Sequence, residues 1–438
     1  MRPKLILTIS LFVLFFLGEI AITLSFKDAD SGNTPVSDII PLSHKLSNSQ
    51  SSDTLTAEVD SIITEFMEKW DITGASVAIT KDGRLAYAKG FGYANEDNNE
   101  YVTPKHLFRI ASVSKLITAV TVMKLIEDEK LSLDSKVFGK DGILNDSIYL
   151  NYSDKRVEEI TVHHLLNHTA GWNSRKGDPI FNSLYIARVM HVEPPAKIEH
   201  VIQYALQRNL NNKPGINYSY SNLGYCILGE VIEKISGMEY EDYVQFAILH
   251  PLGIYDMRIG HSFYEERYNH EVAYYDLSRR SDIWKFDGSR ELAPLPYGGN
   301  NIELLGAAGG WIASAPELAK LIVAIDGFSD RPDILSTESV YTMTYSKGMS
   351  RKLIGWRGTD GYGRWWRSGT LAGTSALLMR NRDGINWVIL LNTSTRSRSK
   401  IHNVLSHTMF MAVRSVEKWP ERDLFNYQPP AEEKLALK

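Results

Sequence analysis

The stretch LFRIASVSKLITAVTVMKLIEDEKLSL, residues 107–133, is the part of the sequence that decides the fold. It contains a Ser-x-x-Lys pattern in which Ser112 and Lys115 stand three residues apart. Apolar residues then repeat at helical spacing and predict an amphipathic helix over residues 114–130. Because three residues make slightly less than one helical turn, the hydroxyl and the amine share a face of that helix and can meet.

A serine and a lysine in this arrangement have two interpretations. A serine hydroxyl is a poor nucleophile until a base takes its proton. A lysine amine, with an ordinary pKa of about 10.4, can be that base only where burial or a neighbouring cation lowers its pKa. The positive end of the helix dipole would also favour negative charge on the oxygen of Ser112. In the alternative interpretation, Ser112 or Ser114 merely caps the helix and Lys115 is solvated.

Several segments, in chain order, resemble those of one enzyme family. Residues 107–115 with the helix that follows are similar to the nucleophile segment of class C β-lactamase-like serine hydrolases. The resemblance covers roughly residues 55–415. The other segments are ITVHHLLNHTAG at residues 160–171, PGINYSYSNLGY at residues 214–225 and GGWIASAPELA at residues 309–319.

The resemblance implies a fold and two further catalytic residues. The fold is the serine β-lactamase/DD-peptidase fold, an α/β (α+β) sandwich whose antiparallel sheet is flanked by helices and carries an inserted all-helical subdomain. In the family's Tyr-x-Asn motif the tyrosine, here Tyr220, shuttles protons. The asparagine, here Asn222, hydrogen-bonds the carbonyl or side-chain amide of the substrate. The chemistry agrees, since a phenol beside an ammonium group can be pushed toward phenolate.

The third motif of the family, Lys-Thr-Gly or His-x-Gly on a strand, falls at residues 366–370, where this sequence departs from the pattern. Arg367 stands where lysine or histidine is usual; it keeps a cation but cannot shuttle protons. Gly369 would let a substrate backbone approach, and the N–H of Thr370 would join that of the nucleophile in an oxyanion hole. The alternative is an arginine that merely decorates an edge strand. The predicted substrate-binding residues here are Arg367, Ser368, Gly369 and Thr370.

Arg398 is a further candidate for substrate binding. It lies with Arg396 and Lys400 just before the last predicted helix, where cations are mildly unfavourable. Related enzymes place polar groups in this region to hold a substrate carboxylate. The alternative is a solvated loop.

No metal or cofactor is expected. His164 and His168 stand four residues apart, as zinc ligands can, but no His-Glu-x-x-His pattern or nearby carboxylate completes a site. The single cysteine, Cys226, lies in an apolar run that predicts a buried, inert thiol. The sequence has no glycine-rich phosphate loop, no Rossmann fingerprint and no Gly-x-Ser-x-Gly elbow.

The two ends of the chain differ from the rest. Residues 1–26 begin with two basic residues and an apolar run, which is typical of a signal peptide, although an uncleaved membrane anchor is the alternative. We therefore expect an exported protein, periplasmic or secreted, or one anchored in the inner membrane. Residues 27–54 are polar and predict a spacer, and residues 419–438 predict a loose tail.

The middle of the chain predicts one serine hydrolase domain at residues 55–418. Hairpins are indicated at residues 74–94 and 374–391, near both ends of this domain. The economical arrangement is one sheet subdomain built from residues 55–130 and 300–418, with a helical subdomain at about 131–300 inserted.

Composition limits the partners. The 438 residues are 43% hydrophobic and 23% charged, with a formal net charge of −4, so no basic field favours nucleic acid. The first hypothesis is a hydrolase of amide or ester bonds, DD-carboxypeptidase- or esterase-like. Its partner would be a small-molecule or peptide substrate: a peptidoglycan stem peptide, a β-lactam or an ester. The second is a membrane-tethered, penicillin-binding or sensor-like protein that binds or is acylated without turnover.

Overall fold

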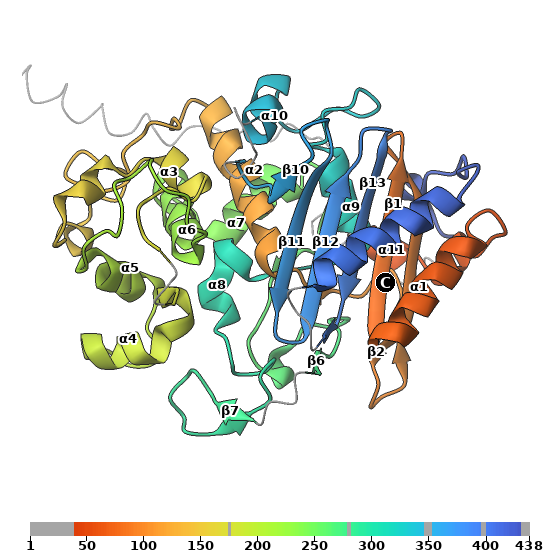
Figure 1. The fold of residues 1–438 in the computed structure, drawn as a ribbon, viewed down its shortest axis with the longest axis horizontal. Coiled ribbons are helices and arrows are strands. Elements are labelled where there is room, and N and C mark those ends of the chain that lie inside the picture. Colours follow the sequence, from red (N-terminus) through yellow and green to blue (C-terminus); the bar gives the residue numbers. More distant parts are fainter. Residues whose placement is uncertain (1–38, 174–176, 278–281, 346–352, 396–399, 431–438) are drawn as a thin grey trace, which may run out of the picture. The chain divides into compact units, whose positions relative to one another are not determined.

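A seven-stranded antiparallel sheet forms the centre of the fold (Figure 1). The structure is a computed structural model that describes residues 39–173, 177–277, 282–345, 353–395 and 400–430. In spatial order the strands of the sheet are β10 (Gly358–Thr359), β11 (Trp365–Leu371), β12 (Thr374–Arg380), β13 (Ile385–Leu391), β1 (Gly74–Lys81), β2 (Arg84–Asn95) and β3 (Glu100–Tyr101).

Eleven α-helices and seven shorter strands are found in the described part of the chain. The helices are α1 (Ala57–Trp70), α2 (Ser114–Glu127), α3 (Val162–Leu166), α4 (Ser183–Met190), α5 (Ile198–Leu206), α6 (Asn222–Ser236), α7 (Tyr240–Val244), α8 (Ile302–Gly309), α9 (Ala315–Val323), α10 (Thr337–Thr344) and α11 (Ile401–Ser415). The shorter strands are β4 (Phe108–Arg109), β5 (Arg258–Ile259), β6 (Tyr275–Asp276), β7 (Ile283–Trp284), β8 (Leu292–Ala293), β9 (Trp311–Ala313) and β14 (Thr393–Ser394).

Both predicted hairpins are present, and they join the two ends of the domain into one sheet. β1 and β2 are connected by Asp82 and Gly83, whose φ angles of 48° and 71° suit a tight hairpin turn. β12 and β13 turn at Gly384, whose φ is 73°. β1 then pairs with β13, with Val77 opposite Ile389. The prediction of a sheet built from both termini is therefore confirmed.

Alternation along the central strands provides two hydrophobic faces. Val77 and Ile79 of β1 point toward α1 and α11 and belong to the core on that side, while Ala78 between them belongs to the core on the other side. Figure 1 shows α1 and α11 lying across one face of the sheet. On the opposite face α9 packs against β1 and β13, and α2 is almost entirely buried.

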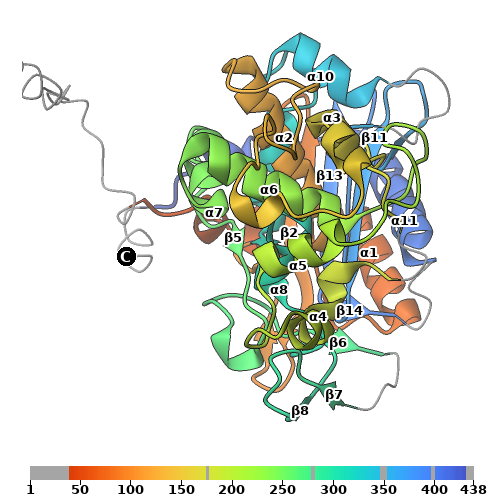
Figure 2. The same ribbon diagram turned by 90° about the vertical axis from the view of Figure 1, so that its left-hand side faces the viewer.

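Helices make up most of the regular secondary structure in the inserted region, residues 131–300. Figure 2 looks onto this part of the chain and shows α3, α4, α5 and α6 in front of the sheet. The region also contains four two-residue strands, β5 to β8, so it is not purely helical. α6 packs against both α2 and α8, which brings its first turn next to the Ser-x-x-Lys segment.

Two predicted boundaries of the domain are wrong. Residues 40–54 belong to the compact unit that starts at Ile40, and they are not a spacer. Leu42 and Leu46 are each only 5% exposed, and the side-chain amide of Asn48 donates to the carbonyl of Gly90 at 3.1 Å. The two leucines and the asparagine carboxamide of this polar segment therefore cover the sheet.

The start of the supposed C-terminal tail is also packed. Leu424 and Phe425 are buried, and the Asp423 carboxylate accepts the backbone N–H of Leu85 at 3.1 Å. The tail prediction is therefore wrong for residues 423–426. Asp423 accepts a hydrogen bond from the backbone at an exposed edge of β2. The predicted signal or anchor segment, residues 1–26, lies outside the described residues. Within the residues that are described, no helix is long and apolar enough to cross a membrane.

Candidate active site

The nucleophile candidate Ser112 lies at the junction between a single 3-10 turn (η4, Ala111–Val113) and α2. Ala111 has a φ of 48°, a left-handed conformation that a residue with a Cβ rarely adopts and that marks local strain. Val113 occupies the helix N-cap position without a side-chain cap. The Ser114 hydroxyl instead donates to the carbonyl of Ala111 at 2.7 Å. Capping therefore does not explain either serine.

Lys115 lies one turn further on, and its side chain is completely buried. Its Nζ donates to Asn222 Oδ1 at 2.7 Å and to the carbonyl of Ala308 at 2.5 Å. It also lies 3.4 Å from Ser112 Oγ, which is a long hydrogen bond. Burial lowers the pKa of Lys115, an effect that Tyr220 opposes and the cation of Arg367 reinforces. Two short bonds to acceptors therefore hold the amine, and its contact with the nucleophile is the weakest of the three.

Tyr220 makes the shorter contact with the nucleophile. Its hydroxyl donates to Ser112 Oγ at 2.7 Å, and an N–H of Arg367 donates to the same phenol oxygen at 3.2 Å. Burial raises the pKa of Tyr220, but the positive charges of Lys115 and Arg367 outweigh it and lower this pKa to about 8. A phenol oxygen that ionises near neutral pH thus faces the serine hydroxyl.

Asn222 occupies the first position of α6, where it connects Lys115 with Asp178. Its side-chain oxygen accepts the Lys115 ammonium, and its backbone N–H donates to Asp178 Oδ2 at 2.6 Å. Asp178 also accepts the N–H of Ile180 at the start of a short 3-10 turn. The carboxylate of Asp178 therefore anchors the first turn of α6 and, with it, the carboxamide that holds Lys115.

His168 holds the segment that carries Tyr220. Its carbonyl accepts the N–H of Ser219 at 2.9 Å and its Nδ1 accepts the N–H of Ser221 at 3.3 Å, one residue on either side of the tyrosine. The imidazole ring packs 4.6 Å from the Tyr220 ring, centroid to centroid. Burial, with the nearby cations of Arg367 and Lys115, lowers the pKa of His168 well below its usual range. A neutral histidine thus positions the phenol.

Arg367 of β11 is buried, with 1% of its surface exposed, and it binds the catalytic segment itself. Its Nε donates to the carbonyl of Ser112 at 2.7 Å, while the contact with Tyr220 uses Nη2. This arginine therefore holds the Ser112 segment and Tyr220 in place, whereas the sequence predicted a substrate contact. It is also more than a decoration of an edge strand, because both contacts lie inside the site.

Gly369 is required by a close approach of two chain segments. A Cβ at this position would lie 2.2 Å from the carbonyl oxygen of Ile110 and 2.8 Å from the nitrogen of Ser112. The glycine therefore lets β11 contact the nucleophile segment directly. From the sequence we expected this space to serve the substrate backbone.

Ser368 and Thr370 face the open edge of β11. The carbonyl of Trp366 accepts the N–H of Arg357 at 2.8 Å, so the backbone of Trp366 points to this edge. Backbone groups two and four residues further along a strand point the same way, and β10 pairs only with residues 365 and 366. The N–H of Thr370 therefore projects from the free edge beside Ser112, as an oxyanion-hole donor must.

Four of the predicted residues thus meet around one point, while others fall elsewhere. Ser112, Lys115, Tyr220 and Asn222 form one hydrogen-bonded cluster. Arg398 lies outside the described residues. His164, the other half of the zinc alternative, accepts the N–H of Thr161 through Nδ1 and so caps α3. His168 likewise uses its Nδ1 for a local contact, with the N–H of Ser221.

Three groups near the site were not predicted from the sequence. The carbonyl of Ala308 is a backbone group, and only the fold brings it to Lys115. His402 of α11 contacts the Thr370 hydroxyl at 3.0 Å. The exposed Arg357 donates to the Tyr218 hydroxyl at 3.1 Å and lies 5.8 Å from the centre of the Tyr220 ring. Cys226, in contrast, is buried as predicted, and burial raises the pKa of its thiol.

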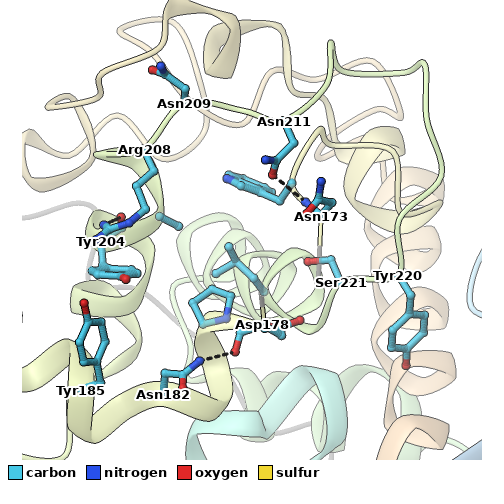
Figure 3. A pocket seen from close by; sticks show the side chains of 15 residues that line it. Asn173, Asp178, Asn182, Tyr185, Tyr204, Arg208, Asn209, Asn211, Tyr220 and Ser221 are labelled. Carbon is cyan, nitrogen blue, oxygen red and sulfur yellow. Dashed lines mark hydrogen bonds between the residues drawn. The ribbon is translucent and has the colours of Figure 1, made fainter. Parts of the chain in front are cut away.

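A cavity of about 610 Å³ adjoins this cluster on the side of the inserted helices (Figure 3). Tyr220 and Ser221 form one end of its lining. The figure shows Tyr185 and Tyr204 along the opposite side. A space of this volume is within the range that small-molecule sites occupy.

Comparisons with known proteins agree with the fold. The Beta-lactamase family model matches residues 59–407. Solved structures with the same fold include the octameric penicillin-binding protein homologue from Pyrococcus abyssi, with a TM-score of 0.61 and 28% identity over 84% of this chain and 78% of that one. The D-amino acid amidase from Ochrobactrum anthropi SV3 has a TM-score of 0.63 over 84% of this chain and 100% of its own, but at 19% identity it shows the fold alone. This chain belongs to the beta-lactamase family, and its fold is that of β-lactamase-type serine hydrolases.

Curated relatives match over a shorter stretch. Protein flp of Staphylococcus aureus (strain MRSA252) is 27% identical over 231 residues, which are 52% of this chain and 42% of that protein. Penicillin-binding protein 4* of Bacillus subtilis (strain 168) is 29% identical over 194 residues, 44% of this chain and 39% of that protein. The matched part therefore spans less than half the length of either relative.

Proposed function

We propose that this protein is a serine hydrolase that forms an acyl-enzyme at Ser112 and cleaves amide or ester bonds. The observation that carries the proposal is the 2.7 Å contact between Tyr220 and Ser112 Oγ, with two buried cations beside the phenol. A serine becomes a nucleophile when a base within hydrogen-bond reach takes its proton. The phenolate of Tyr220 is the group with that position and that pKa.

The proton path follows from these distances. The Tyr220 phenolate takes the proton of Ser112 as Oγ attacks the substrate carbonyl carbon. The N–H groups of Ser112 and Thr370 receive the oxyanion of the tetrahedral intermediate. When the intermediate collapses, the leaving amine or alkoxide takes the proton from Tyr220, and the acyl group stays on Ser112. Water then gives a proton to Tyr220, attacks the acyl ester and releases the acid, and Ser112 regains its proton.

Lys115 acts in this scheme as a fixed cation. Two short hydrogen bonds orient its ammonium group at 4.9 Å from the centre of the Tyr220 ring. In this scheme its positive charge stabilises the phenolate. From the sequence Lys115 was the first candidate for the proton acceptor, and the shorter distance to Ser112 favours Tyr220.

The substrate class rests on the family. One structural neighbour is a penicillin-binding protein homologue and one curated relative is a penicillin-binding protein. We propose an amide or ester acyl donor for this chain, with peptidoglycan stem peptides, β-lactams and short esters as the three kinds to compare. Removing an oxyanion donor typically slows such reactions by about 10²–10³-fold. Slow turnover of a poor substrate is therefore measured against a variant that lacks the serine.

Mass spectrometry of the intact protein tests the proposal. We expect a fluorophosphonate or a fluorescent penicillin to add one label to the wild type and none to Ser112→Ala. Ser114→Ala is the matched control, because Ser114 lies two residues away and is buried, so it should still label. Label on Ser112→Ala would contradict the mechanism. A penicillin adduct that never turns over, with no hydrolysis of any ester or peptide, would favour the alternative of a binding protein without turnover.

Export is a separate proposal that rests on residues 1–26 alone. Their basic start and apolar run are typical of a signal peptide or anchor. Fractionation of cells that express the full chain, with the mass of the mature N-terminus, tests it. A protein found in the cytoplasm with residues 1–26 intact would contradict it.

A further inference from the structure

A second cavity, of about 550 Å³, lies on the other face of the sheet from the Ser112 cluster. It is bounded by α11, by the turn between β12 and β13 and by Arg364, which precedes β11. Met379 and Trp387 line it and belong to the hydrophobic core on the side of α1 and α11. The nucleophile segment, with Val113, belongs to the core on the opposite side. The cavity is therefore separate from the candidate active site.

The floor of this cavity is apolar. Met379 of β12 and Trp387 of β13 stand directly opposite each other and are 6% and 2% exposed. Phe410 and Val413 of α11 continue the apolar surface on the helix side. Apolar and aromatic lining of this kind is what small-molecule sites use to bind the body of a ligand.

Three arginines line the rim of the cavity. Arg382 and Arg414 are exposed, and Arg364 is half-buried. Arg364 donates to the side-chain oxygen of Asn381 at 3.1 Å, and the guanidinium of Arg414 lies 5.0 Å from the centre of the Phe410 ring. Both partners are neutral, so these contacts do not cancel the charge of either arginine.

Negative charges near the rim are fewer than positive ones. Among the described residues Asp383 is the one carboxylate of the lining, against three arginines. Burial raises the pKa of Asp360, just outside the lining, but two backbone N–H groups and the charges of Arg364 and Arg382 lower it. The surroundings stay positive with both carboxylates counted, although the whole chain has a formal net charge of −4.

Polar groups of α11 lie between the arginines and the floor. Asn403, His407, Phe410 and Arg414 recur at intervals of three or four residues, so one face of the helix is turned to the cavity. Ser406 adds a hydroxyl to the same lining. A small number of placed polar groups in an apolar site fixes the orientation of a ligand.

The chemistry of the rim and the floor selects a ligand with two different ends. Guanidinium groups bind carboxylate and phosphate oxygens through paired N–H donors. A positive rim repels a cation. An anion without an apolar part would leave the floor uncovered, and an apolar molecule without charge would leave the arginines unused.

We propose that this cavity binds a small amphiphilic anion, that is, an apolar body that carries one carboxylate or phosphate head. The body contacts Trp387, Met379 and Phe410, and the head binds the guanidinium groups of Arg382 and Arg414. None of the four clustered groups around Ser112 lines this cavity. The inference is therefore independent of the proposed function and adds a second binding site to the molecule.

Equilibrium dialysis of the wild type with radiolabelled octanoate tests the proposal. Octyl phosphate, octan-1-ol and octylammonium, which carry the same chain, compete against it. We expect dissociation constants of about 0.1–1 mM for the two anions, as for good ligands of this size. The alcohol and the ammonium compound should each bind at least about tenfold more weakly. The tighter of the two anions identifies the head group, and the proposal holds for either.

Variants of exposed lining residues locate the binding. Arg382→Gln and Arg414→Gln should each weaken octanoate binding about three- to tenfold, while Arg188→Gln, at an exposed arginine of α4 outside the lining, should not change it. Phe410→Ala should weaken it to a similar extent. Its control is Met411→Ala, the next residue of α11, which is outside the lining and 47% exposed where Phe410 is 41%.

Three outcomes would overturn the proposal. They are equal binding of octanoate and octan-1-ol, unchanged binding in both arginine variants when thermal unfolding shows a native fold, and no bound octanoate at roughly 10 mM, far above the expected constant. These measurements need no reaction at Ser112, so the second site and the proposed function can fail separately.

Discussion

Removing the positive charge of Arg367 should raise the pH at which Ser112 becomes reactive. Burial raises the pKa of Tyr220, and the charges of Lys115 and Arg367 bring it down to about 8. A nearby cation stabilises the phenolate, so its removal must raise this pKa. The proposed mechanism needs the phenolate as base, and the rate of labelling should therefore rise with pH through the pKa of Tyr220.

The structure sets the size of the effect. The Arg367 nitrogen lies 3.2 Å from the phenol oxygen. Coulomb's law with an effective dielectric constant of about 20 gives roughly 5 kcal/mol at that distance, which is an upper limit of nearly four pKa units. Opposite charges this close typically shift a pKa by about 1–3 units. In Arg367→Gln we expect the midpoint to move from about 8 to about 9 or higher.

The assay is the second-order rate of fluorophosphonate labelling between pH 6 and pH 10. Arg367→Lys is the matched control: like Arg367→Gln it loses the two-nitrogen contact with Ser112 and Tyr220, but it keeps the charge. Its midpoint should stay within about half a unit of the wild type, since the cation near Tyr220 remains. A midpoint near 8 in Arg367→Gln, in protein whose thermal unfolding shows a native fold, would refute the role given to this charge.

Three further predictions concern Gly369, Glu317 and Cys226. Gly369→Ala should slow labelling by about a hundredfold or more, because a Cβ there meets Ile110 and displaces an oxyanion donor; a labelling rate within a few-fold of the wild type would contradict the close approach. Burial, with the charge of Asp256, raises the pKa of Glu317 to about 8, so stability is lost as pH rises from the unfolded pKa of about 4.5 toward 8. Glu317→Gln should remove this loss and gain up to about 3 kcal/mol relative to the wild type between pH 5 and pH 8 in urea unfolding; parallel pH dependences of the two proteins would refute it. Cys226→Ser should label at the wild-type rate, and iodoacetamide should leave native Cys226 unmodified, because burial raises the pKa of its thiol; rapid alkylation would contradict a buried thiol.

Local patterns in the sequence were sufficient for most of the architecture. The hairpin turns at Asp82-Gly83 and Asp383-Gly384 were predicted because a positive φ at glycine is a property of the turn itself. The helix after Ser112 was predicted because its apolar period is local as well. The boundaries at residues 40–54 and 423–426 were missed because a polar composition does not reveal that a few apolar residues cover an exposed edge.

The chemical groups of the site were predicted from the sequence, but the role of each group was not. The motifs at residues 112–115 and 220–222 identify the hydroxyl, the amine, the phenol and the carboxamide. A motif has no distances, so it could not show that Tyr220 is closer than Lys115 to the serine hydroxyl. The buried position of Arg367 and the reason for Gly369 are equally invisible along the chain, since both depend on β11 packing against the nucleophile segment.

The sequence by itself determined which chemical groups the candidate site contains and where most helices and strands lie, because side-chain type, turn residues and hydrophobic period are properties of short segments. Only the tertiary structure decided which group lies closest to the Ser112 hydroxyl, which arginine is buried and where the neighbouring cavity lies. The physical reason is that pKa values and contacts depend on charges and burial contributed by segments that are more than a hundred residues apart, such as Ser112 and Tyr220, which are 108 residues apart.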